Sequence, residues 1–345
     1  MSLSVEFLYL SQEDVVAAGG LDMAATVRDV EDVFRLHASG DYALPDKVVL
    51  RWDEVSAGEK EQHINTMPAY IGGRFQIAGL KTVASFPRNP FIYGLPRASA
   101  LIILNDVERG FPLAVMDGTL ISAMRTGAVT GVAAKYLARN DITRVGLIGA
   151  GVQGRTQLMA LQETLPGIQE AFIYDVHRQR AETFAAEMGG LLDVDVRVAN
   201  SAEETARQAE VLVTATTTTA PVVRNGWLTE GTFYAHISGY ECEYAVVSRM
   251  DKIVVDDWAQ VKHRMAQTVA FMWRDGELRD EDIYGELSEI VSGEKPGRES
   301  NWERILLNPV GMGIEDIAVA KRIYQTAKEQ GLGQMLRLWE RPHWF

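Results

Sequence analysis

The first third of the chain combines one helical period with several alternating, strand-like segments. Residues 22–39 place Met23, Val27 and Phe34 at helical spacing, with acidic residues on the other side, and Gly40 ends the predicted helix. The segments that follow are short and apolar, and turn sequences such as IGGRF and FPRNP separate them. They do not alternate with helices. We expect strands at residues 47–51, 62–70, 76–85, 98–106 and 112–117.

A different rhythm begins after a long segment rich in small residues. Residues 118–139 predict a long helix whose small side chains permit close packing. From residue 144 onward strands alternate with helices, which is typical of a parallel, doubly wound sheet. A last long helix is expected at residues 314–331, with Gly331 as its C-cap. The expected strands are 144–149, 171–175, 194–198, 210–215, near 233–238 and 252–255, and the helices are 152–164, 177–188 and 201–208.

Composition excludes several classes of function. A length of 345 residues suggests two domains, and a net charge of −13 argues against binding to nucleic acid or to an anionic membrane surface. No apolar run approaches the ~18 residues that span a bilayer, and no signal peptide is expected. The single cysteine, Cys242, permits no internal disulfide and fits the reducing cytoplasm. His236, Cys242 and His263 lack the spacing of a metal site, so we expect no metal.

The sequence VGLIGAGVQGRTQL, residues 145–158, has the form of a phosphate-binding loop between a strand and a helix. Gly149 allows the tight turn, Gly151 lets a pyrophosphate approach the backbone, and Gly154 lets the helix pack closely on the strand. The start of the helix supplies N–H groups and a positive dipole. The alternative is a strand–helix turn that binds nothing.

An acidic residue completes this pattern. Asp175 ends the next predicted strand, where it can accept hydrogen bonds from a ribose diol and repel a 2′-phosphate. The sequence therefore favours NAD over NADP, although the nearby Arg178 and Arg180 weaken that preference. We assign the cofactor to Gly149, Gly151, Val152, Gln153, Gly154, Asp175, Thr216 and Thr217.

Two cations lie on apolar faces ahead of this fold. Arg125 shares its helix face with Ile121 and Val129, and strand alternation places Lys81 with Val83. A buried cation needs an anion, so each residue either pairs with an internal carboxylate or binds an anionic substrate. Lys47 and Arg97 are further candidates for substrate binding, and the simpler alternative for both is a solvated surface role.

The chain resembles the ornithine cyclodeaminase/μ-crystallin family over nearly its whole length. The similar segments are INTMPAYIGG, GLKTVAS, LIILND, PLAVMDGTLISAMRTGAV, GLIGAGVQGRTQ and VSGEKPGRES…ILLNPVGMGIEDIA. The segments ILLNPVGMGIEDI and LPRAS are most similar to one branch of the family. That branch contains NAD-dependent dehydrogenases that oxidatively cleave an opine-like precursor, N-(1-amino-1-carboxy-2-ethyl)-glutamate, in 2,3-diaminopropionate biosynthesis for siderophores and antibiotics.

The resemblance implies a fold and an assembly. It implies an α/β protein in which residues 121–309 form a Rossmann NAD-binding domain. Residues 1–120 plus 310–345 are expected to form an α+β domain for substrate binding and dimerisation. A long helix carries the chain into the dinucleotide domain and the C-terminal helix returns to the first domain. The partners implied are a small amino-acid or opine substrate and a second copy of the chain, in a homodimer.

The resemblance also assigns the substrate side. Lys47, Lys81 and Arg125 match the family's cations for the substrate carboxylate. Lys47 stands where cyclodeaminases commonly carry arginine, so a single ammonium charge replaces a guanidinium that binds a carboxylate through two hydrogen bonds. Asn65 stands where ornithine cyclodeaminase has a glutamate that holds the substrate amine, and this difference argues against ornithine. Arg97 matches an arginine of the diaminopropionate branch, and we expect it to bind a distal carboxylate.

The catalytic residues implied are Lys81 and a carboxylate in HISGYECEY. The family's aspartate is absent, and Glu241 is the best replacement. A shifted register would place Tyr240 there instead, and Glu243 is a weaker candidate.

Four functions remain open at this stage. In the first, NAD⁺ takes a hydride from the α-carbon of a secondary amine, and water activated by Glu241 hydrolyses the imine to a keto acid and an amino acid. The second is a cyclodeaminase, which returns its hydride, and the third is an amino-acid dehydrogenase or ketimine reductase. The fourth is a non-catalytic, μ-crystallin-like binding protein. Net NAD⁺ consumption separates the first from the second, and NAD binding without any turnover would favour the fourth.

Overall fold

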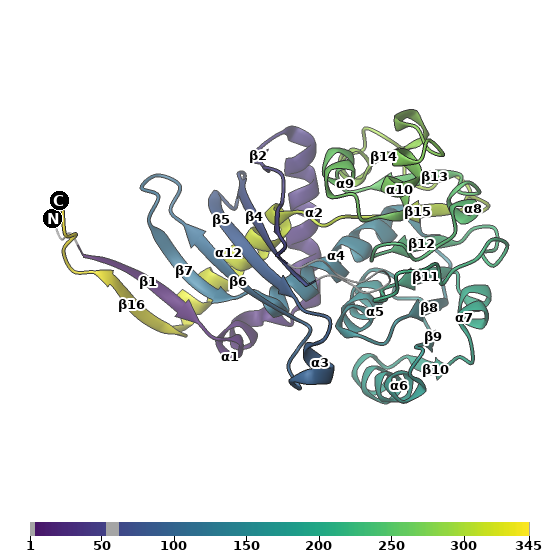
Figure 1. Ribbon diagram of the computed structural model, residues 1–345, viewed down its shortest axis with the longest axis horizontal. Helices are drawn as coiled ribbons and strands as arrows, with labels where there is room; N and C mark the ends of the chain where they lie inside the picture. Colours follow the sequence, from purple (N-terminus) through teal and green to yellow (C-terminus); the bar gives the residue numbers. More distant parts are fainter. Residues whose placement is uncertain (1–3, 53–61, 345) are drawn as a thin grey trace. The chain divides into compact units, whose positions relative to one another are not determined.

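The computed structural model of the chain describes residues 4–52 and 62–344, and it separates into two units (Figure 1). Unit 1 consists of Met1–Arg125 and Met312–Phe345, and unit 2 of Thr126–Gly311, so the division falls within helix α4 (Thr119–Leu137). The α/β class expected from the sequence is confirmed. The expected domain boundaries and the roles given to the two domains stay predictions.

Unit 1 is built on an eight-stranded sheet in the order β16-β1-β7-β6-β5-β4-β2, with β3 also paired to β4. Its pairs are antiparallel except β1 with β7. Helix α12 packs against β4, β5 and β6 (Figure 1). The strands are β1 Val5–Leu10, β2 Tyr42–Ala43, β3 Val48–Leu50, β4 His63–Ile71, β5 Ile77–Ser85, β6 Ala98–Asn105, β7 Pro112–Asp117 and β16 Gln334–Trp339. The helices are α1 Gln12–Val15, the π-helical η1 Val16–Gly20, α2 Met23–Ser39, α3 Asn89–Ile92, the first part of α4, and α12 Gly313–Gln330.

The predicted ends of helices α2 and α12 in unit 1 are confirmed. The side chain of Asp22 caps α2 by accepting a hydrogen bond of 2.8 Å from the Ala25 N–H. Gly40 and Gly331 end α2 and α12 in the left-handed conformation, with φ of +75° and +67°. The five predicted strands are β3 to β7, whereas the sequence pattern does not predict the pairing of β1 with β16.

Unit 2 is built on an eight-stranded sheet in the order β10-β9-β8-β11-β12-β15-β13-β14, and its recorded pairs are parallel. The first five strands have the 3-2-1-4-5 order of a Rossmann fold, so the strand order reverses between β8 and β11. The strands are β8 Arg144–Ile148, β9 Glu170–Tyr174, β10 Asp195–Val198, β11 Val211–Thr214, β12 Phe233–His236, β13 Lys252–Val255, β14 Gly285–Glu286 and β15 Ile305–Leu307. The helices are α5 Val152–Thr164, α6 Arg178–Leu192, α7 Ala202–Gln208, α8 Tyr244–Val247, α9 Trp258–Arg264, α10 Thr268–Arg274, the 3₁₀ turn η2 Asp280–Asp282, and α11 Leu287–Ser292.

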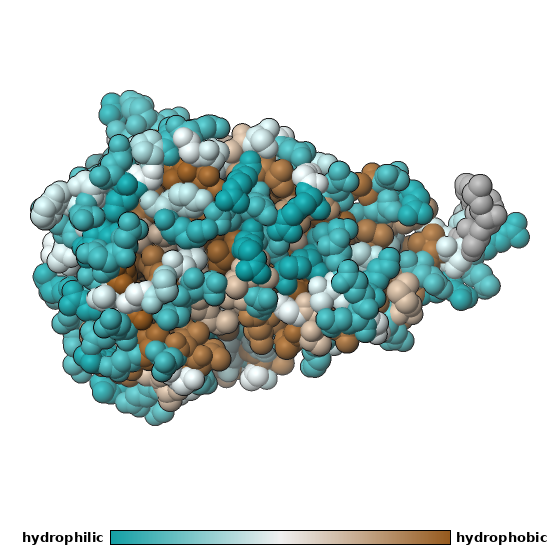
Figure 2. All heavy atoms as spheres, turned by 180° about the vertical axis from the view of Figure 1, so that it is seen from behind, coloured by the Kyte–Doolittle hydropathy of each residue, from teal (hydrophilic) through white to brown (hydrophobic). Residues whose placement is uncertain are grey.

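The predicted alternation of strands and helices in unit 2 is confirmed from β8 to β11, and the strands predicted near residues 233–238 and 252–255 are β12 and β13. Strands β11, β12 and β13 are buried along their whole length, as expected where helices cover both faces of a parallel sheet. On the face of the molecule in Figure 2, hydrophilic side chains predominate and apolar side chains are exposed between them. Among the residues described, no helix is both long and apolar enough to cross a membrane.

Candidate active site

The glycine loop lies at the carboxyl end of β8, where the strand order of unit 2 reverses. Gly149 has a φ of +111°, and a Cβ there would lie 2.5 Å from the Ala215 carbonyl oxygen, so only glycine fits the turn. A Cβ on Gly154 would collide with the Gly149 carbonyl oxygen. By contrast, no atom lies within 4 Å of a Cβ placed on Gly151, which is the N-cap of α5. The loop is therefore tight against the sheet and open at Gly151, where the sequence predicts that a phosphate approaches.

Asp175 fixes the loop to the end of β9. Its Oδ2 accepts a 2.9 Å hydrogen bond from the Ala150 N–H, and its Oδ1 accepts one of 2.9 Å from the His177 N–H. Each carboxylate oxygen has a second lone pair, so the group retains acceptors for a ribose diol. Arg178, which weakens the sequence preference for NAD, is paired with Glu182 at 3.0 Å.

Arg155 braces the same loop, and the sequence analysis did not single it out. Its Nη1 donates to the carbonyl oxygens of Ala150 at 2.8 Å and Gly151 at 3.2 Å, and Glu187 binds the other side of the guanidinium. The carbonyl groups of Ala150 and Gly151 therefore have a partner within the protein. The sequence feature that could have indicated this contact is the position of Arg155 directly after Gly154, the third glycine of the loop.

Glu241 is fully buried and joins the segments that follow β11 and β12. Its Oε1 accepts a 2.6 Å hydrogen bond from the Thr216 N–H, and its Oε2 accepts from the Thr214 hydroxyl at 3.0 Å and from the Ser238 N–H at 2.9 Å. These contacts hold Thr216 in place, whereas Thr217 is exposed. The role of Glu241 as a general base stays a prediction, and its contacts are those of a residue that positions the loop.

The two alternatives to Glu241 have other contacts. Tyr240 is half-buried, its ring centroid lies 5.9 Å from that of Tyr244 and 6.0 Å from that of Phe271, and burial raises its pKa above the usual value. Glu243 accepts a 2.9 Å hydrogen bond from the Asn225 N–H. Both residues are thus engaged in local packing of unit 2.

The two inward cations of unit 1 lie in a buried cluster of four charged residues. Lys81 Nζ is 2.6 Å from Asp316 Oδ2, while Arg125 Nη1 is 2.6 Å from Glu315 Oε2 and Arg125 Nε is 3.1 Å from Asp316 Oδ1. All four side chains are at most 8% exposed. The internal ion pairs that the sequence left as an alternative are therefore present, and substrate binding by Lys81 and Arg125 stays a prediction.

The pKa of Lys81 is lowered from 10.5 to about 8. Burial is the largest cause and the charge of Arg125 is the next, and the carboxylates of Asp316 and Glu315 oppose both. Lys81 also donates a 3.0 Å hydrogen bond to the Ser122 hydroxyl. A lysine with such a pKa is able to exchange a proton near neutral pH.

Strand register places Asn65 beside this cluster. Met67 lies opposite Lys81, and Asn65, two residues away on β4, faces the same side of the sheet. The Oδ1 atom of Asn65 is buried and has no hydrogen-bond partner among residues 4–52 and 62–344. Lys47, two residues before the Val49 that pairs with Asn65, is buried. The structure thus brings Lys81, Asn65 and Arg125 to one side of the unit 1 sheet.

Arg97 differs from Lys81 and Arg125 because no carboxylate among the described residues pairs with it. It precedes β6, where its carbonyl oxygen accepts a 2.8 Å hydrogen bond from the Phe86 N–H. Its Nε atom is buried and has no hydrogen-bond partner within residues 4–52 and 62–344, and burial lowers the pKa of the guanidinium. Because an unpaired buried cation is costly, this guanidinium is suited to bind an anion from solution.

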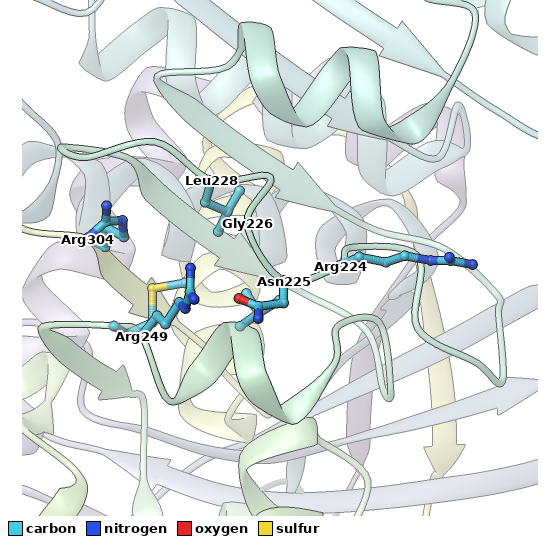
Figure 3. Close-up of a pocket in the computed structure, with 8 residues that line it drawn as sticks. Arg224, Asn225, Gly226, Leu228, Arg249 and Arg304 are labelled. Atoms are coloured by element: carbon cyan, nitrogen blue, oxygen red, sulfur yellow. The ribbon is translucent and has the colours of Figure 1, made fainter.

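A separate hollow in unit 2 is lined by the residues labelled in Figure 3. Its volume of about 20 Å³ is that of a single water molecule, and the side chain of Arg224 extends away from the other labelled residues. We assign no ligand to it. Within the part of the chain that the structure describes, no group of three histidine, cysteine, aspartate or glutamate residues is arranged to hold a metal ion.

The sequence of the chain matches a known family over most of its length. Residues 8–331 match the model of the ornithine cyclodeaminase/mu-crystallin family. The chain belongs to this family. Its resemblance to the family, stated from the motifs above, is thereby confirmed.

Three similar family members indicate what this chain is related to. N-((2S)-2-amino-2-carboxyethyl)-L-glutamate dehydrogenase of Staphylococcus aureus is 37% identical over 97% of this chain and 99% of its own. A solved structure described as an archaeal alanine dehydrogenase dimer with bound NAD is 37% identical, with a TM-score of 0.88 over 97% of this chain and 100% of its own. The Δ1-pyrroline-2-carboxylate reductase of Thermococcus litoralis, solved with NADH and L-proline, is 36% identical, with a TM-score of 0.87 over 95% of this chain and 99% of its own.

Proposed function

We propose that this family member is an NAD-dependent oxidoreductase that oxidises the CH–NH group of an amino-acid-derived opine. The relative from Staphylococcus aureus, similar over the full length, acts on a substrate of this class. The structural observation that carries the choice of an opine is Arg97, a partly buried guanidinium that no carboxylate among the described residues pairs with. A plain amino acid has one carboxylate, whereas N-(2-amino-2-carboxyethyl)-glutamate has three and needs a further cation.

The residues of unit 2 fit the cofactor. The open space at Gly151, the start of α5 and the carboxylate of Asp175 provide for a pyrophosphate and a ribose diol. Bound NAD⁺ would supply a hydride acceptor. Val152, Gln153, Thr216 and Thr217 complete the proposed cofactor set.

The reaction balances with one water molecule. The α-carbon of the glutamate moiety loses a hydride, its bond to nitrogen becomes C=N, water adds to that carbon, and the C–N bond breaks. The products are 2-oxoglutarate, 2,3-diaminopropionate, reduced cofactor and a proton. We assign to Lys81, which has a pKa of about 8, the exchange of protons with the amine and the adding water. Arg125 and Lys47 orient the carboxylate at the reacting carbon, and Arg97 binds a distal one.

Two other activities of the family remain testable. Asn65 provides an amide where ornithine cyclodeaminase has a glutamate, which argues against ornithine. A simple amino-acid dehydrogenase or ketimine reductase is the second candidate, because the two solved relatives described above act on substrates smaller than an opine. A panel of amines and opines with NAD⁺, followed by absorbance of the reduced cofactor, tests the proposal. A preference for alanine or proline over every opine would replace it with the second candidate, and NAD binding with no turnover would favour a binding protein.

The cofactor preference rests on Asp175. We expect the unmodified protein to bind NAD more tightly than NADP, and Asp175→Ser to relax this preference because the repulsion of the 2′-phosphate is lost. Titrations with both cofactors, followed by intrinsic fluorescence, measure the ratio of dissociation constants. Tighter binding of NADP by the unmodified protein would contradict the assignment.

We propose a homodimer formed through the unit 1 sheet. Tyr9, Val115 and Ile103 lie side by side in register on the face opposite to Lys81, and Leu101 follows on the same face. Leu101 is 48% exposed and Tyr9 is 39% exposed. An apolar sheet face of this kind is suited to be covered by a second copy of the chain. The single cysteine, which is buried, is compatible with the proposed location in the cytoplasm.

The dimer proposal predicts that Leu101→Arg produces monomers, because it places a charge in an apolar interface. Size-exclusion chromatography with light scattering measures the mass. The matched control is Leu191→Arg on α6, where the leucine is 63% exposed and belongs to unit 2. An unchanged mass for Leu101→Arg would exclude this face as the interface.

A further inference from the structure

One carboxylate on α12 joins the two cations of the buried cluster. Asp316 Oδ2 lies 2.6 Å from Lys81 Nζ on β5, and Asp316 Oδ1 lies 3.1 Å from Arg125 Nε on α4. Three elements that are distant in sequence therefore meet at a single side chain. We propose that Asp316 is the positioning residue of the reaction: it holds Lys81 and Arg125 in a fixed mutual geometry and keeps Lys81 protonated. This inference rests on the proposed function.

The start of α12 is shaped to bring Asp316 to Lys81. Gly313, the first residue of α12, approaches β4 so closely that a Cβ there would lie 3.1 Å from the Met67 carbonyl oxygen and 3.4 Å from the Ala69 Cβ. Asp316 follows one helical turn later, and Met67 lies opposite Lys81 in the sheet. The close approach at Gly313 thus places the carboxylate directly over the lysine.

The remaining hydrogen-bonding capacity of Lys81 points to the substrate. A lysine ammonium has three N–H groups. Asp316 accepts from one at 2.6 Å and the Ser122 hydroxyl from another at 3.0 Å. The third has no acceptor among the described residues, so a substrate atom is its natural partner. Asp316 and Ser122 fix the direction in which this third N–H group points.

The charged groups around Lys81 determine how the removal of Asp316 changes the pKa of this lysine. The charged groups that face Lys81 are Arg125 from α4 and Glu315 and Asp316 from α12, while β4 and β6 place Met67 and Ile102 beside it. Asp316 raises the pKa of Lys81, against the lowering by burial and Arg125. Without Asp316 this pKa falls below about 8, and Lys81 loses its proton at a lower pH.

The test compares Asp316→Asn, Asp316→Glu and Glu315→Gln. Glu315 contacts Arg125 as Asp316 does, but it makes no hydrogen bond to Lys81, so it is the matched control. We expect Asp316→Asn to lower kcat/KM for the opine by ~100-fold, because the reacting groups are no longer held in position. In the plot of kcat/KM against pH, the inflection caused by the ionisation of Lys81 should move to lower pH. Asp316→Glu should restore the pH of this inflection, and Glu315→Gln should leave the inflection nearer to its pH in the unmodified protein. The NAD dissociation constant should not change in any of them.

A second readout needs no substrate. Lys81 has a folded-state pKa of about 8 and an unfolded value near 10.5, so the unfolded state binds the extra proton between these values. The free energy of unfolding, taken as the difference from Lys81→Met, therefore rises as the pH increases from about 8 to 10.5. In Asp316→Asn this rise should begin at a lower pH.

The two readouts separate the inference from the proposed function. If no opine is oxidised but the pH range over which the free energy of unfolding rises moves in Asp316→Asn, the proposed function is wrong and the control of Lys81 by Asp316 holds. The inference would be overturned if neither this pH range nor the inflection in the pH dependence of kcat/KM moves. If Asp316→Asn does not fold, Asp316→Glu decides: a folded protein with lowered kcat and unchanged NAD affinity supports the positioning role, and unchanged kcat overturns it.

Discussion

Arg125→Met is expected to abolish turnover and to lower the free energy of unfolding by about 3–5 kcal/mol. Arg125 is paired with Glu315 and Asp316 inside unit 1, and its removal leaves two buried carboxylates with Lys81 as their remaining cation in the cluster. Urea unfolding measures the stability, and absorbance of the reduced cofactor measures turnover. NAD affinity should be unchanged wherever the variant is folded, because the cofactor residues belong to unit 2.

Two further variants separate the possible causes of this loss. Arg178→Met removes an exposed pair with Glu182 and should change the stability by less than about 1 kcal/mol. Arg125→Lys keeps the charge but loses the guanidinium that contacts Glu315 and Asp316 through two nitrogen atoms. We therefore expect low activity and a free energy of unfolding between those of Arg125→Met and the unmodified protein. Equal stability of Arg125→Met and the unmodified protein would mean that the buried ion pairs do not form in solution.

Arg97→Ala is expected to lower kcat/KM for a multi-carboxylate opine by about one to two powers of ten, because a charge-assisted hydrogen bond contributes roughly 1.5–3 kcal/mol. Activity on an amine with one carboxylate should be nearly unchanged. The free energy of unfolding should stay the same or rise, because the substitution removes a partly buried cation that no carboxylate among the described residues pairs with.

The control for Arg97 is Arg109→Ala in the same unit. Arg109 is 74% exposed and paired with Asp106, so its removal should change neither kinetic constant. Steady-state kinetics of both variants with an opine and with a monocarboxylate amine give the comparison. If Arg97→Ala and the unmodified enzyme are equally active on the best opine, Arg97 does not belong to the site, and the choice of an opine over a simple amino acid loses its structural support.

The geometry of the glycine loop was predictable because its determinants are local. A strand, three glycines and a following helix lie within residues 145–158, and the steric reasons for Gly149 and Gly154 apply to the backbone itself. The strands β3 to β7 were predictable for the same reason, since alternation and turn residues act over a few positions. Asp175 followed from its place at the end of the next strand.

The partners of the inward cations were not predictable, because they lie far away in the sequence. Asp316 is 235 residues from Lys81, and Glu315 is 190 residues from Arg125. A pattern did exist, since Asp316 shares a helix face with Val319, Ala320 and Ile323, which marks it as an inward acid. Sequence spacing shows that such charges are buried but does not show which of them meet.

Pairing over long distances also explains the unpredicted strands. β1 and β16 lie at opposite ends of the chain and pair at the edge of the unit 1 sheet, where half of their residues stay exposed and the apolar signal is weak. Glu241 was expected as a catalytic carboxylate from the resemblance to the family, as the best replacement for the absent aspartate. Its burial and its three hydrogen bonds depend on how the ends of β11 and β12 meet, which no local pattern contains.

The most direct measurement of the central claim is the stoichiometry of the reaction with N-(2-amino-2-carboxyethyl)-L-glutamate and NAD⁺. Absorbance gives the reduced cofactor, and mass spectrometry gives the products. We predict one NADH for each 2-oxoglutarate and each 2,3-diaminopropionate released, and no net NADH with ornithine. Product formation without net NADH, or oxidation of alanine or proline while the opine is left unchanged, would contradict the account.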